Sequence, residues 1–447
     1  MDRKRSVFAG GVHPTDGGDK AITSGKKIIP YIPDTVKVSM KQGLGPECTC
    51  VVKAGDQVTQ GQLIGESAHF LSAAIHAPVT GKVLSVKDNF CEIKVESCEL
   101  PDGSAACNQK WCDISSYSRE DLIEKLRQGG LVGMGGAGFP TAAKYQTKDP
   151  ITHLLINAAE CEMFLTCDEH MMLEQGMAIL NGVQILKKAA GAANAVICME
   201  DNKPHCKESL EKLLKGHEDE IRIQVFPTRY PQGGEKQLIK AAMNVEIPSG
   251  KLPSSVGAIV SNVQTAKAAA DMVLSGMPST SRCITITGCV KNPANYLVPL
   301  GTNIGELVAK SGDVTERKNK IVLGGPMTGR CIGVKQNARG ISEIRDARVS
   351  KVSGGLLVLK ETNMVESNCI RCGSCDKACP IGLTPFKIDA AIRKGDLALC
   401  QSLQATECIA CGCCSYVCPA KRELSHHTVQ ARDAVRAKLR EEANRGK

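Results

Sequence analysis

The chain has 447 residues, too many for one hydrophobic core, and its 42% hydrophobic and 23% charged residues are typical of a globular protein. The net charge of +9 is modest and suits an acidic partner protein or an anionic lipid surface, whereas 3% aromatic residues and the lack of a known nucleic-acid motif argue against nucleic-acid binding. No stretch approaches the ~18 consecutive apolar residues of a membrane helix, and residues 1–11 lack the apolar core of a secretory signal.

Cysteine usage predicts a reducing compartment. Of the 23 cysteines, eight belong to two regular runs and fifteen do not. Scattered free thiols are a liability in an oxidising compartment, and most of the fifteen are expected to be small buried residues. We therefore expect a cytosolic chain, or one bound to a membrane from the cytosolic side.

Residues 1–110 are expected to form the first domain, built from short strands and glycine turns. Residues 51–62 predict a turn, a strand and a turn, and residues 75–83 form a second half of the same kind. This pairing resembles the barrel-sandwich fold of lipoyl and biotinyl domains, which carry a modifiable lysine at a hairpin tip between the halves. Residues 66–74 contain no lysine, which favours a structural barrel without a swinging arm over one modified at Lys53 or Lys82.

Residues 111–276 are expected to form a layered α/β domain, because strands and helices alternate from about residue 119. Strands are predicted at residues 153–157, 195–199, 221–226 and 256–263. Helices are predicted at residues 171–190, where apolar residues recur at three-to-four spacing, and at the alanine-rich residues 264–274. The first strand ends at Asn157, as strands do at a binding edge.

The rest of the chain predicts two smaller units and a tail. Residues 277–361 read as an α+β module, with strands at 283–286, 321–325 and 354–359 and a helix at 304–310. Residues 362–425 are cysteine-rich. Residues 426–447 contain a basic helix at 429–443 whose charges have both signs, which favours a solvated cap over membrane insertion.

Two cysteine runs of identical spacing are the most specific signal in the chain. The spacing C-x2-C-x2-C-x3-C-P is that of a two-cluster bacterial ferredoxin, in which three thiolates of a tight loop bind one [4Fe–4S] cube and the fourth cysteine reaches the other cube. Zinc would leave a third regularly spaced pair unexplained. We predict one cluster on Cys369, Cys372, Cys375 and Cys418 and another on Cys408, Cys411, Cys414 and Cys379, and hence a protein that transfers electrons.

A glycine-rich loop at residues 133–141 precedes the first strand of the α/β domain. Glycines let backbone N–H groups close on a phosphate or a flat ring, and Lys144 is near enough in sequence to neutralise phosphate charge. The loop has neither the Gly-Lys-Ser/Thr of a Walker motif nor the strand-before-loop order of a dinucleotide fold. From the residues alone, a ligand-binding loop and a plain turn stay equally open.

Residues 133–144 resemble the flavin loop of the NADH-oxidising subunit of respiratory complex I. Three more segments are similar to that subunit in the same order, namely residues 157–162 (NAAECE), 230–235 (YPQGGE) and 261–265 (SNVQT). Where the subunit has arginine, aspartate, glutamate and asparagine, this chain has Met134, Ala159, Gly234 and Ser261. The general site is therefore expected, with altered hydrogen bonding.

In its domain order the whole chain resembles the RnfC family, the C subunits of Rnf complexes. The resemblance implies a multidomain α/β and α+β fold, consisting of a barrel-sandwich domain, a Rossmann-like FMN/NADH domain, a β-grasp module of the SLBB type and a two-cluster ferredoxin domain. It implies a peripheral subunit on the cytoplasmic face of the cell membrane. In that family the complex couples electron flow between ferredoxin and NAD to sodium or proton translocation, which implies an NAD-linked oxidoreductase and translocase subunit. The implied partners are NADH and the other subunits of the complex, including a ferredoxin-like electron-carrying subunit.

The resemblance also implies a linear path between NADH, FMN, two [4Fe–4S] clusters and a partner's redox centre. A flavin is required because a hydride carries two electrons, whereas an iron–sulfur cluster accepts one. The FMN phosphate is expected at Gly133, Gly135, Gly136, Gly138 and Lys144, and the flavin ring or ribityl chain near Asn157, Tyr230, Asn262 and Thr265. Glu160 and Glu162 are expected at the nicotinamide and ribose as catalytic residues, and Phe139 on the adenine.

Structural alternatives remain open for these residues and for the chain. The glutamates suit a solvated loop, Asn262 and Thr265 suit a helix cap, and Tyr230 suits packing at a turn. The alternative function is a soluble flavin and iron–sulfur reductase that feeds a corrinoid enzyme or an amino-acid reductase. A further alternative is an electron relay without flavin.

Overall fold

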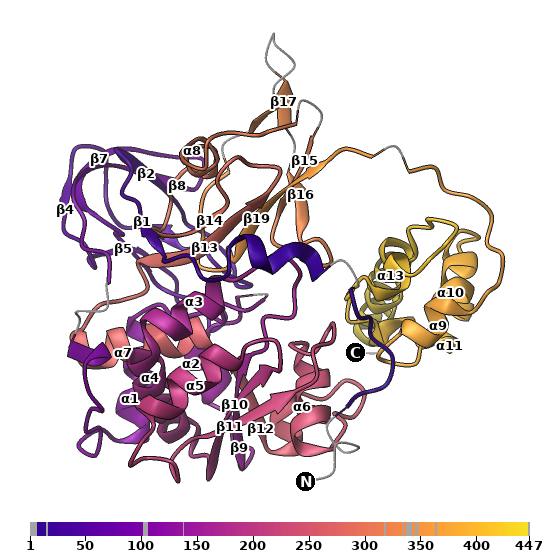
Figure 1. Cartoon of the computed structure of the whole chain (residues 1–447), viewed down its shortest axis with the longest axis horizontal. Coiled ribbons are helices and arrows are strands. Elements are labelled where there is room, and N and C mark those ends of the chain that lie inside the picture. Colours follow the sequence, from indigo (N-terminus) through magenta and orange to yellow (C-terminus); the bar gives the residue numbers. More distant parts are fainter. Residues whose placement is uncertain are drawn as a thin grey trace.

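The computed structural model describes residues 7–14, 17–101, 106–136, 138–316, 319–332, 334–336, 342–344, 347–362 and 364–445. Figure 1 shows a larger body, made of a barrel, an α/β domain and a third sheet, with a helical C-terminal domain beside it. The expected multidomain α/β and α+β fold is confirmed.

The barrel is built from two antiparallel sheets, in the orders β2-β8-β7-β4 and β3-β5-β6. Alternate side chains of β2 point inward, and Val36 and Val38 meet Ile64, Ile75 and Ile93 in one core. The strands are β2 (Thr35–Ser39), β3 (Thr49–Cys50), β4 (Gln57–Val58), β5 (Leu63–Glu66), β6 (Ile75–His76), β7 (Thr80–Lys87) and β8 (Phe90–Ser97).

The α/β domain has a parallel sheet in the order β11-β10-β9-β12. Its strands are β9 (His153–Ala158), β10 (Asn194–Glu200), β11 (Arg222–Phe226) and β12 (Ala258–Asn262). Its helices are α1 (Arg119–Gln128), α2 (Thr141–Tyr145), α3 (Cys167–Glu174), α4 (Gly176–Ala190), α5 (Pro204–Leu213), α6 (Glu235–Met243) and α7 (Val263–Ser275). Because the first and fourth strands in chain order lie side by side, the sheet has a switch point between β9 and β12, where doubly wound sheets bind ligands.

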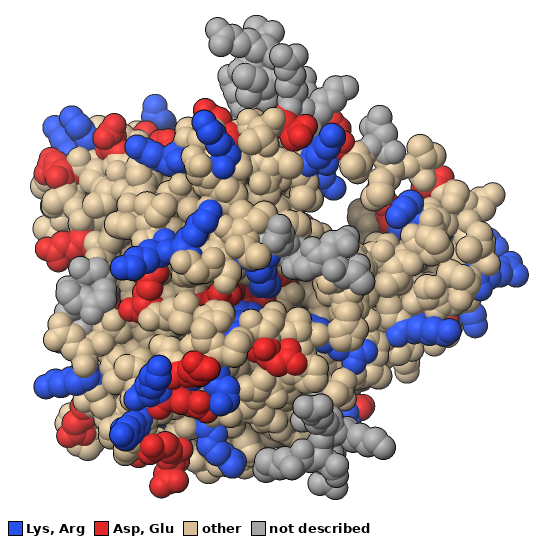
Figure 2. Space-filling view, in the orientation of Figure 1, with Lys and Arg blue, Asp and Glu red and all other residues tan. Residues whose placement is uncertain are grey.

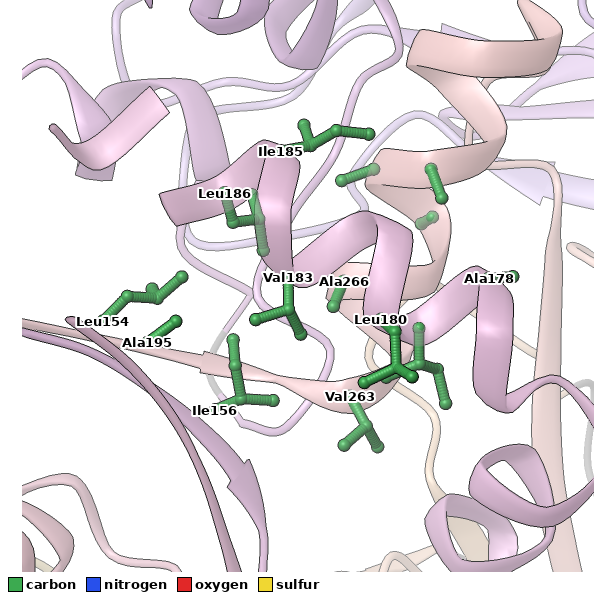
Figure 3. Packing of buried hydrophobic residues seen from close by; sticks show 14 of the residues in the cluster. Leu154, Ile156, Ala178, Leu180, Val183, Ile185, Leu186, Ala195, Val263 and Ala266 are labelled. Carbon is green, nitrogen blue, oxygen red and sulfur yellow. The ribbon is translucent and has the colours of Figure 1, made fainter. Parts of the chain in front are cut away.

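The core of this domain fixes the ends of those two strands. Figure 3 shows Leu180 and Val183 of α4 close to Ile156 of β9 and to Val263 at the start of α7. Each of these side chains is fully buried, and such burial contributes about 1.5–3 kcal/mol per large apolar side chain. The strand ends are therefore rigidly positioned.

Two predicted boundaries differ in the structure. The helix predicted at residues 171–190 is divided into α3 and α4, because Gln175 leaves helical geometry and its Nε2 donates to the Pro101 carbonyl oxygen at 2.7 Å. The strand predicted at residues 256–263 is the shorter β12. Gly257 ends the short helix η4 (Pro253–Val256) with a φ of 73°, and Asn262 caps α7.

The third sheet has the order β1-β14-β13-β19-β15-β16 and is covered by α8 (Ile304–Lys310). Its strands are β1 (Ile29–Pro30), β13 (Ser281–Gly288), β14 (Ala294–Pro299), β15 (Asn319–Leu323), β16 (Arg330–Ile332) and β19 (Gly355–Lys360); β17 (Val334–Gln336) and β18 (Ser342–Ile344) form a separate pair. The strand β1 comes from the part of the chain that the sequence assigns to the barrel, and it pairs with β14.

Residues 8–14 and 17–30, which we call the N-terminal segment, lead from the C-terminal domain to the body (Figure 1). Gly11 N donates to the Ala378 carbonyl oxygen at 2.9 Å, and Val12 forms an antiparallel bridge with Tyr230. Within the following short helix η2 (Gly17–Ile22), Lys20 Nζ donates to the carbonyl oxygens of Glu160 at 2.6 Å and Leu165 at 2.5 Å. The segment therefore contacts three units of the protein.

The C-terminal domain is helical, with α9 (Ser374–Ala378), α10 (Pro385–Ile392), α11 (Leu397–Ser402), η5 (Ala405–Glu407), α12 (Cys413–Tyr416) and α13 (Leu424–Arg445). The last helix begins earlier than predicted. Its Ala431 and Val435 are fully buried in a core with Ile388 and Cys400, so α13 packs on its own domain.

No helix of the described residues combines the length and the apolar character needed to cross a bilayer. Figure 2 shows Lys and Arg interspersed with Asp and Glu over the body on the side in view.

Candidate functional site

A cavity of about 650 Å³ opens at the carboxyl ends of β9 and β12. Asn157 and Asn262 are register partners at those strand ends, and both side chains line the cavity. The glycine loop, α2, residues 233–235, residues 252–254 and two barrel residues form the rest of the wall. The cavity therefore lies at the switch point of the sheet, where a nucleotide-type ligand is expected.

The glycine loop presents bare backbone to this cavity. Gly133, Gly135, Gly136 and Gly138 all line it. A Cβ built on Gly136 would meet no atom within 4 Å, whereas one on Gly135 would lie 3.1 Å from Asn262 Cβ. The absence of side chains leaves room for a phosphate or a flat ring against the loop, so these residues fit FMN.

The back of the glycine loop is held by α7 of its own domain and by β13 of the third sheet. Met134 N donates to Thr265 Oγ1 at 2.9 Å, and the Arg282 guanidinium donates to the Met134 carbonyl oxygen at 2.7 Å. Thr265 is fully buried and does not line the cavity. The structure thus places Thr265 behind the loop, where it supports the backbone from outside the cavity.

Lys144 and Phe139 line the cavity together with the glycines. Lys144 Nζ donates to Glu235 Oε1 and to the Val260 carbonyl oxygen, both at 2.7 Å. An anion in the cavity would share this ammonium group with Glu235. Lys144 is therefore held in place before a ligand arrives.

The two asparagines are fixed by hydrogen bonds on their outer sides. Asn157 Nδ2 donates to the Gly233 carbonyl oxygen at 2.9 Å. Asn262 Oδ1 accepts from Gln264 N at 2.9 Å, so Asn262 forms the helix cap considered from the sequence. Its Nδ2 donates to Asp168 Oδ2 at 2.6 Å. Asn262 thus combines a capping role with a place in the cavity wall.

Glu160 and Glu162, which are expected at the nicotinamide and ribose, do not line this cavity. Glu160 accepts from the backbone N–H groups of Asp168 at 2.7 Å and Glu169 at 3.2 Å, and burial raises its pKa to about 7. Glu162 Oε1 accepts from Met327 N at 2.7 Å, and burial raises its pKa too. The chain turns at Glu160, which has a positive φ of 45°, and this turn directs both carboxylates to neighbouring loops.

Tyr230 also lies outside the cavity, at the contact with the C-terminal domain. Its side chain is buried, and its hydroxyl donates to the Cys411 carbonyl oxygen at 2.8 Å. Tyr230 therefore has the packing role considered from the sequence, and its hydroxyl also forms a hydrogen bond with a cysteine loop.

The eight motif cysteines line two separate cavities in the C-terminal domain. One cavity is lined by Cys369, Cys372, Cys375 and Cys418, and the other by Cys379, Cys408, Cys411 and Cys414. Each run thus sends its fourth cysteine to the other cavity, as predicted from the spacing. Four thiols around one cavity are the donor set of a [4Fe–4S] cube, so both sets fit the clusters.

Two further residues near the cysteines are possible ligands by type. Cys413, which directly precedes Cys414, also lines the second cavity, and its side chain is wholly buried. His427 Nδ1 lies 2.7 Å from Asp389 Oδ1, so this histidine is engaged by a carboxylate.

The second of these cavities faces the body of the protein. Besides the Tyr230 contact, Lys236 Nζ lies 3.0 Å from Glu407 Oε2, one residue before Cys408. The first cavity lies farther out: Cys369 and Cys372 are exposed, and Ile370 between them is 68% exposed. The two cluster sites therefore have an inner and an outer position.

Sequence reasoning missed several residues of the cavity wall. Leu44 and Phe70 from the barrel and Leu252, Pro253 and Ser254 from η4 and the residue before it all line the cavity. They belong to no motif. The packing of the barrel against the α/β domain brings Leu44 and Phe70 to the site, and the turn before β12 brings the other three.

Three family models match the chain. They are the RnfC barrel sandwich hybrid domain over residues 6–98, the Nuo51 FMN-binding domain over residues 126–271, and the SLBB domain over residues 283–330. They correspond in order to the barrel, the α/β domain and the third sheet.

Curated relatives match most of the chain. The C subunit of the ion-translocating oxidoreductase complex of Rhodobacter capsulatus is 36% identical over 406 residues, which cover 87% of this chain and 75% of that protein. The C subunit of the proton-translocating ferredoxin:NAD(+) oxidoreductase complex of Clostridium ljungdahlii is 37% identical over 394 residues, which cover 85% of this chain and 82% of that protein.

Among solved structures, an NAD+-reducing [NiFe]-hydrogenase has a similar fold. Its H2-reduced state aligns with a TM-score of 0.50 at 18% identity, over 71% of this chain and 63% of that chain. Its air-oxidised state aligns with a TM-score of 0.51 at 17% identity, over 74% and 69%. At this identity the match concerns the fold alone.

Proposed function

The chain belongs to the RnfC family, the C subunits of ion-translocating oxidoreductase complexes, and we propose that it is the electron-input subunit of a complex that transfers electrons between ferredoxin and NAD. Its cofactors are FMN and [4Fe–4S] clusters, and its substrate is NAD(H). The observation that carries the proposal is the arrangement of eight cysteines as two sets of four, one of which abuts the domain with the glycine-loop cavity.

We assign the FMN site to the cavity at the switch point. The backbone of Gly135, Gly136 and Gly138 would hold the phosphate, with Lys144 as its cation, and Asn157 and Asn262 would position the ring. When bound, FMN accepts the two electrons of a hydride and passes them on singly. Four other candidate residues would have supporting roles at this ligand, because their side chains are hydrogen-bonded to backbone groups outside the cavity. These are Glu160, Glu162, Tyr230 and Thr265.

The order of the two cluster sites follows from their positions. The set Cys379, Cys408, Cys411 and Cys414 lies against the body and would exchange electrons with the flavin side. The set Cys369, Cys372, Cys375 and Cys418, whose loop carries exposed residues, would exchange electrons with a partner. A redox partner that docks here would be an electron-carrying subunit with a cluster of its own.

We further propose that the complete complex is a translocase and that this chain is a peripheral subunit on the cytoplasmic face of the cell membrane. The family membership supports both statements, and the membrane-spanning partners would conduct the ion. Co-purification of the chain with membrane subunits from solubilised membranes would favour this role. Recovery of an active reductase without such subunits would favour the soluble alternative.

An anaerobic NADH titration of the purified, cluster-loaded chain tests the proposal. We expect the flavin absorbance and the broad cluster absorbance to fall together as NADH is added, since the flavin feeds the clusters. If iron is present but NADH changes neither absorbance, the chain is a relay between partners. In that case the assignment of residues 133–144 to FMN is wrong.

A further inference from the structure

The geometry points to a part of the nucleotide site that the barrel supplies: we propose that Phe70 and Leu44 bind the adenine ring of NAD(H) at the mouth of the glycine-loop cavity. This inference rests on the proposed function and names two substrate-binding residues outside the matched FMN-binding domain, which covers residues 126–271. It gives the barrel, which has no lysine at its tip, a role in the site.

The first of two barrel loops is bonded directly to the glycine loop. Leu44 N donates to the Gly138 carbonyl oxygen at 3.2 Å. Gly43 approaches so closely that a Cβ at this position would overlap the same carbonyl oxygen. The backbone of Leu44 is thereby held beside the glycines that are proposed to hold the flavin phosphate.

The second loop, residues 67–74 at the barrel tip, carries Phe70. The C-terminal end of the loop is held by two hydrogen bonds: Ser72 Oγ donates to the Pro46 carbonyl oxygen at 2.9 Å, and Lys351 Nζ donates to the Ala74 carbonyl oxygen at 2.8 Å. Ser72 N also donates to the His69 carbonyl oxygen at 2.9 Å. Phe70 therefore stands on an ordered loop that is attached to both the barrel and the third sheet.

The wall of the cavity contains residues of different chemistry. It includes glycine backbone, the amide groups of Asn157 and Asn262, and the buried apolar residues Ile259 and Val260. At the mouth, Leu44 and Phe70 are each 55% exposed and Leu252 is 72% exposed, which is unusual for three large apolar side chains around one cavity.

An adenine ring suits this mouth better than any other part of the substrate. The nicotinamide has to reach the flavin beside the glycine loop and the two asparagines, so the adenosine end of the same molecule extends outward. A purine presents flat apolar faces, which stack on aromatic side chains. Phe139 of the glycine loop lines the same cavity, so the α/β domain and the barrel each offer one aromatic ring to the base.

The first experiment compares Phe70→Ala and Leu44→Ala with the wild-type full chain, loaded with FMN and clusters. We expect the KM for NADH to rise about tenfold for Phe70→Ala and less for Leu44→Ala, with kcat and FMN content unchanged. Leu84→Ala is the matched control, because Leu84 is a 45% exposed leucine of the barrel that does not line the cavity.

Two shortened ligands locate the effect at the adenine. Reduced nicotinamide mononucleotide lacks the adenosine, so Phe70→Ala should leave its KM unchanged. ADP-ribose lacks the nicotinamide, and its affinity, measured by calorimetry, should fall about tenfold in the variant.

Three results would overturn the inference: an unchanged KM for NADH in both variants, an equal rise for the mononucleotide, or a loss of FMN from Phe70→Ala. The last result would mean that the barrel covers the flavin. If NADH fails to reduce the wild-type chain, the proposed function falls, and the calorimetry with ADP-ribose still decides the role of Phe70.

Discussion

The buried ammonium group of Lys351 gives a quantitative test of how the barrel is joined to the site. Its side chain is wholly buried, and Nζ donates to the carbonyl oxygens of Ala74 at 2.8 Å and Gly130 at 2.6 Å. Burial lowers its pKa from 10.5 to about 7. Burial lowers the pKa of the neighbouring His76 to about 4, so this histidine adds no second positive charge beside Lys351 near neutral pH.

The sign of the pH dependence follows from these two pKa values. Above the folded pKa, the unfolded chain binds a proton at Lys351 that the folded chain does not bind, so the contribution of this lysine to stability rises with pH up to the unfolded value of 10.5. One pKa unit corresponds to about 1.4 kcal/mol, so the gain between about pH 7 and pH 9 is about 2 kcal/mol. The substitution Lys351→Met removes this gain.

Hydrogen exchange measures the effect locally, which suits a chain of several domains. The opening free energy of peptides around residue 351 should rise by about 2 kcal/mol more in wild type than in Lys351→Met over that pH range. The variant should also be less stable throughout, because two buried carbonyl oxygens lose their donor at about 1–3 kcal/mol each. Lys94→Met, at an exposed lysine of the barrel, is the control. Parallel pH profiles in wild type and Lys351→Met would refute the reasoning.

Three further predictions concern the cofactor sites. Cys372→Ser should remove one cluster and halve the iron content, whereas Cys413→Ser should keep both clusters. Iron analysis and electron paramagnetic resonance measure this, and equal iron loss in the two variants would contradict the ligand sets. Tyr230→Phe should retain FMN, because Tyr230 lies outside the cavity, but should lower the melting temperature, since the Cys411 carbonyl oxygen loses a buried donor worth about 1–3 kcal/mol. Gly136→Val should fold normally, because this position faces open space, yet lose FMN; a variant that keeps FMN in flavin fluorescence assays would show that the phosphate lies elsewhere.

The sequence predicted best those features that short segments encode. The spacing of the cysteine runs determines which thiols share a loop, and the structure brings Cys418 and Cys379 to the opposite cavities as that spacing requires. The polar ends of two parallel strands are equally local signals, and Asn157 and Asn262 stand side by side in register.

Features that depend on contacts between distant segments were not predictable in this way. Nothing near Phe70 in sequence indicates that the barrel tip packs beside a loop more than sixty residues later. The acidic residues Glu160 and Glu162 follow directly after a strand end, but the positive φ of Glu160 turns them to backbone donors that only the folded chain provides. The pairing of β1 with β14 has the same origin, since two residues carry too little pattern to reveal a partner.

The N-terminal segment bears on the maturation of the protein. Gly11 leaves the ribosome well before Ala378, in the helix that precedes Cys379, yet its N–H group donates to the Ala378 carbonyl oxygen. A Cβ at Gly10 would overlap the carbonyl group of Cys379, so the segment lies directly on the loop of one proposed cluster ligand. We therefore expect iron and sulfide to reach this loop more easily before the segment docks on it.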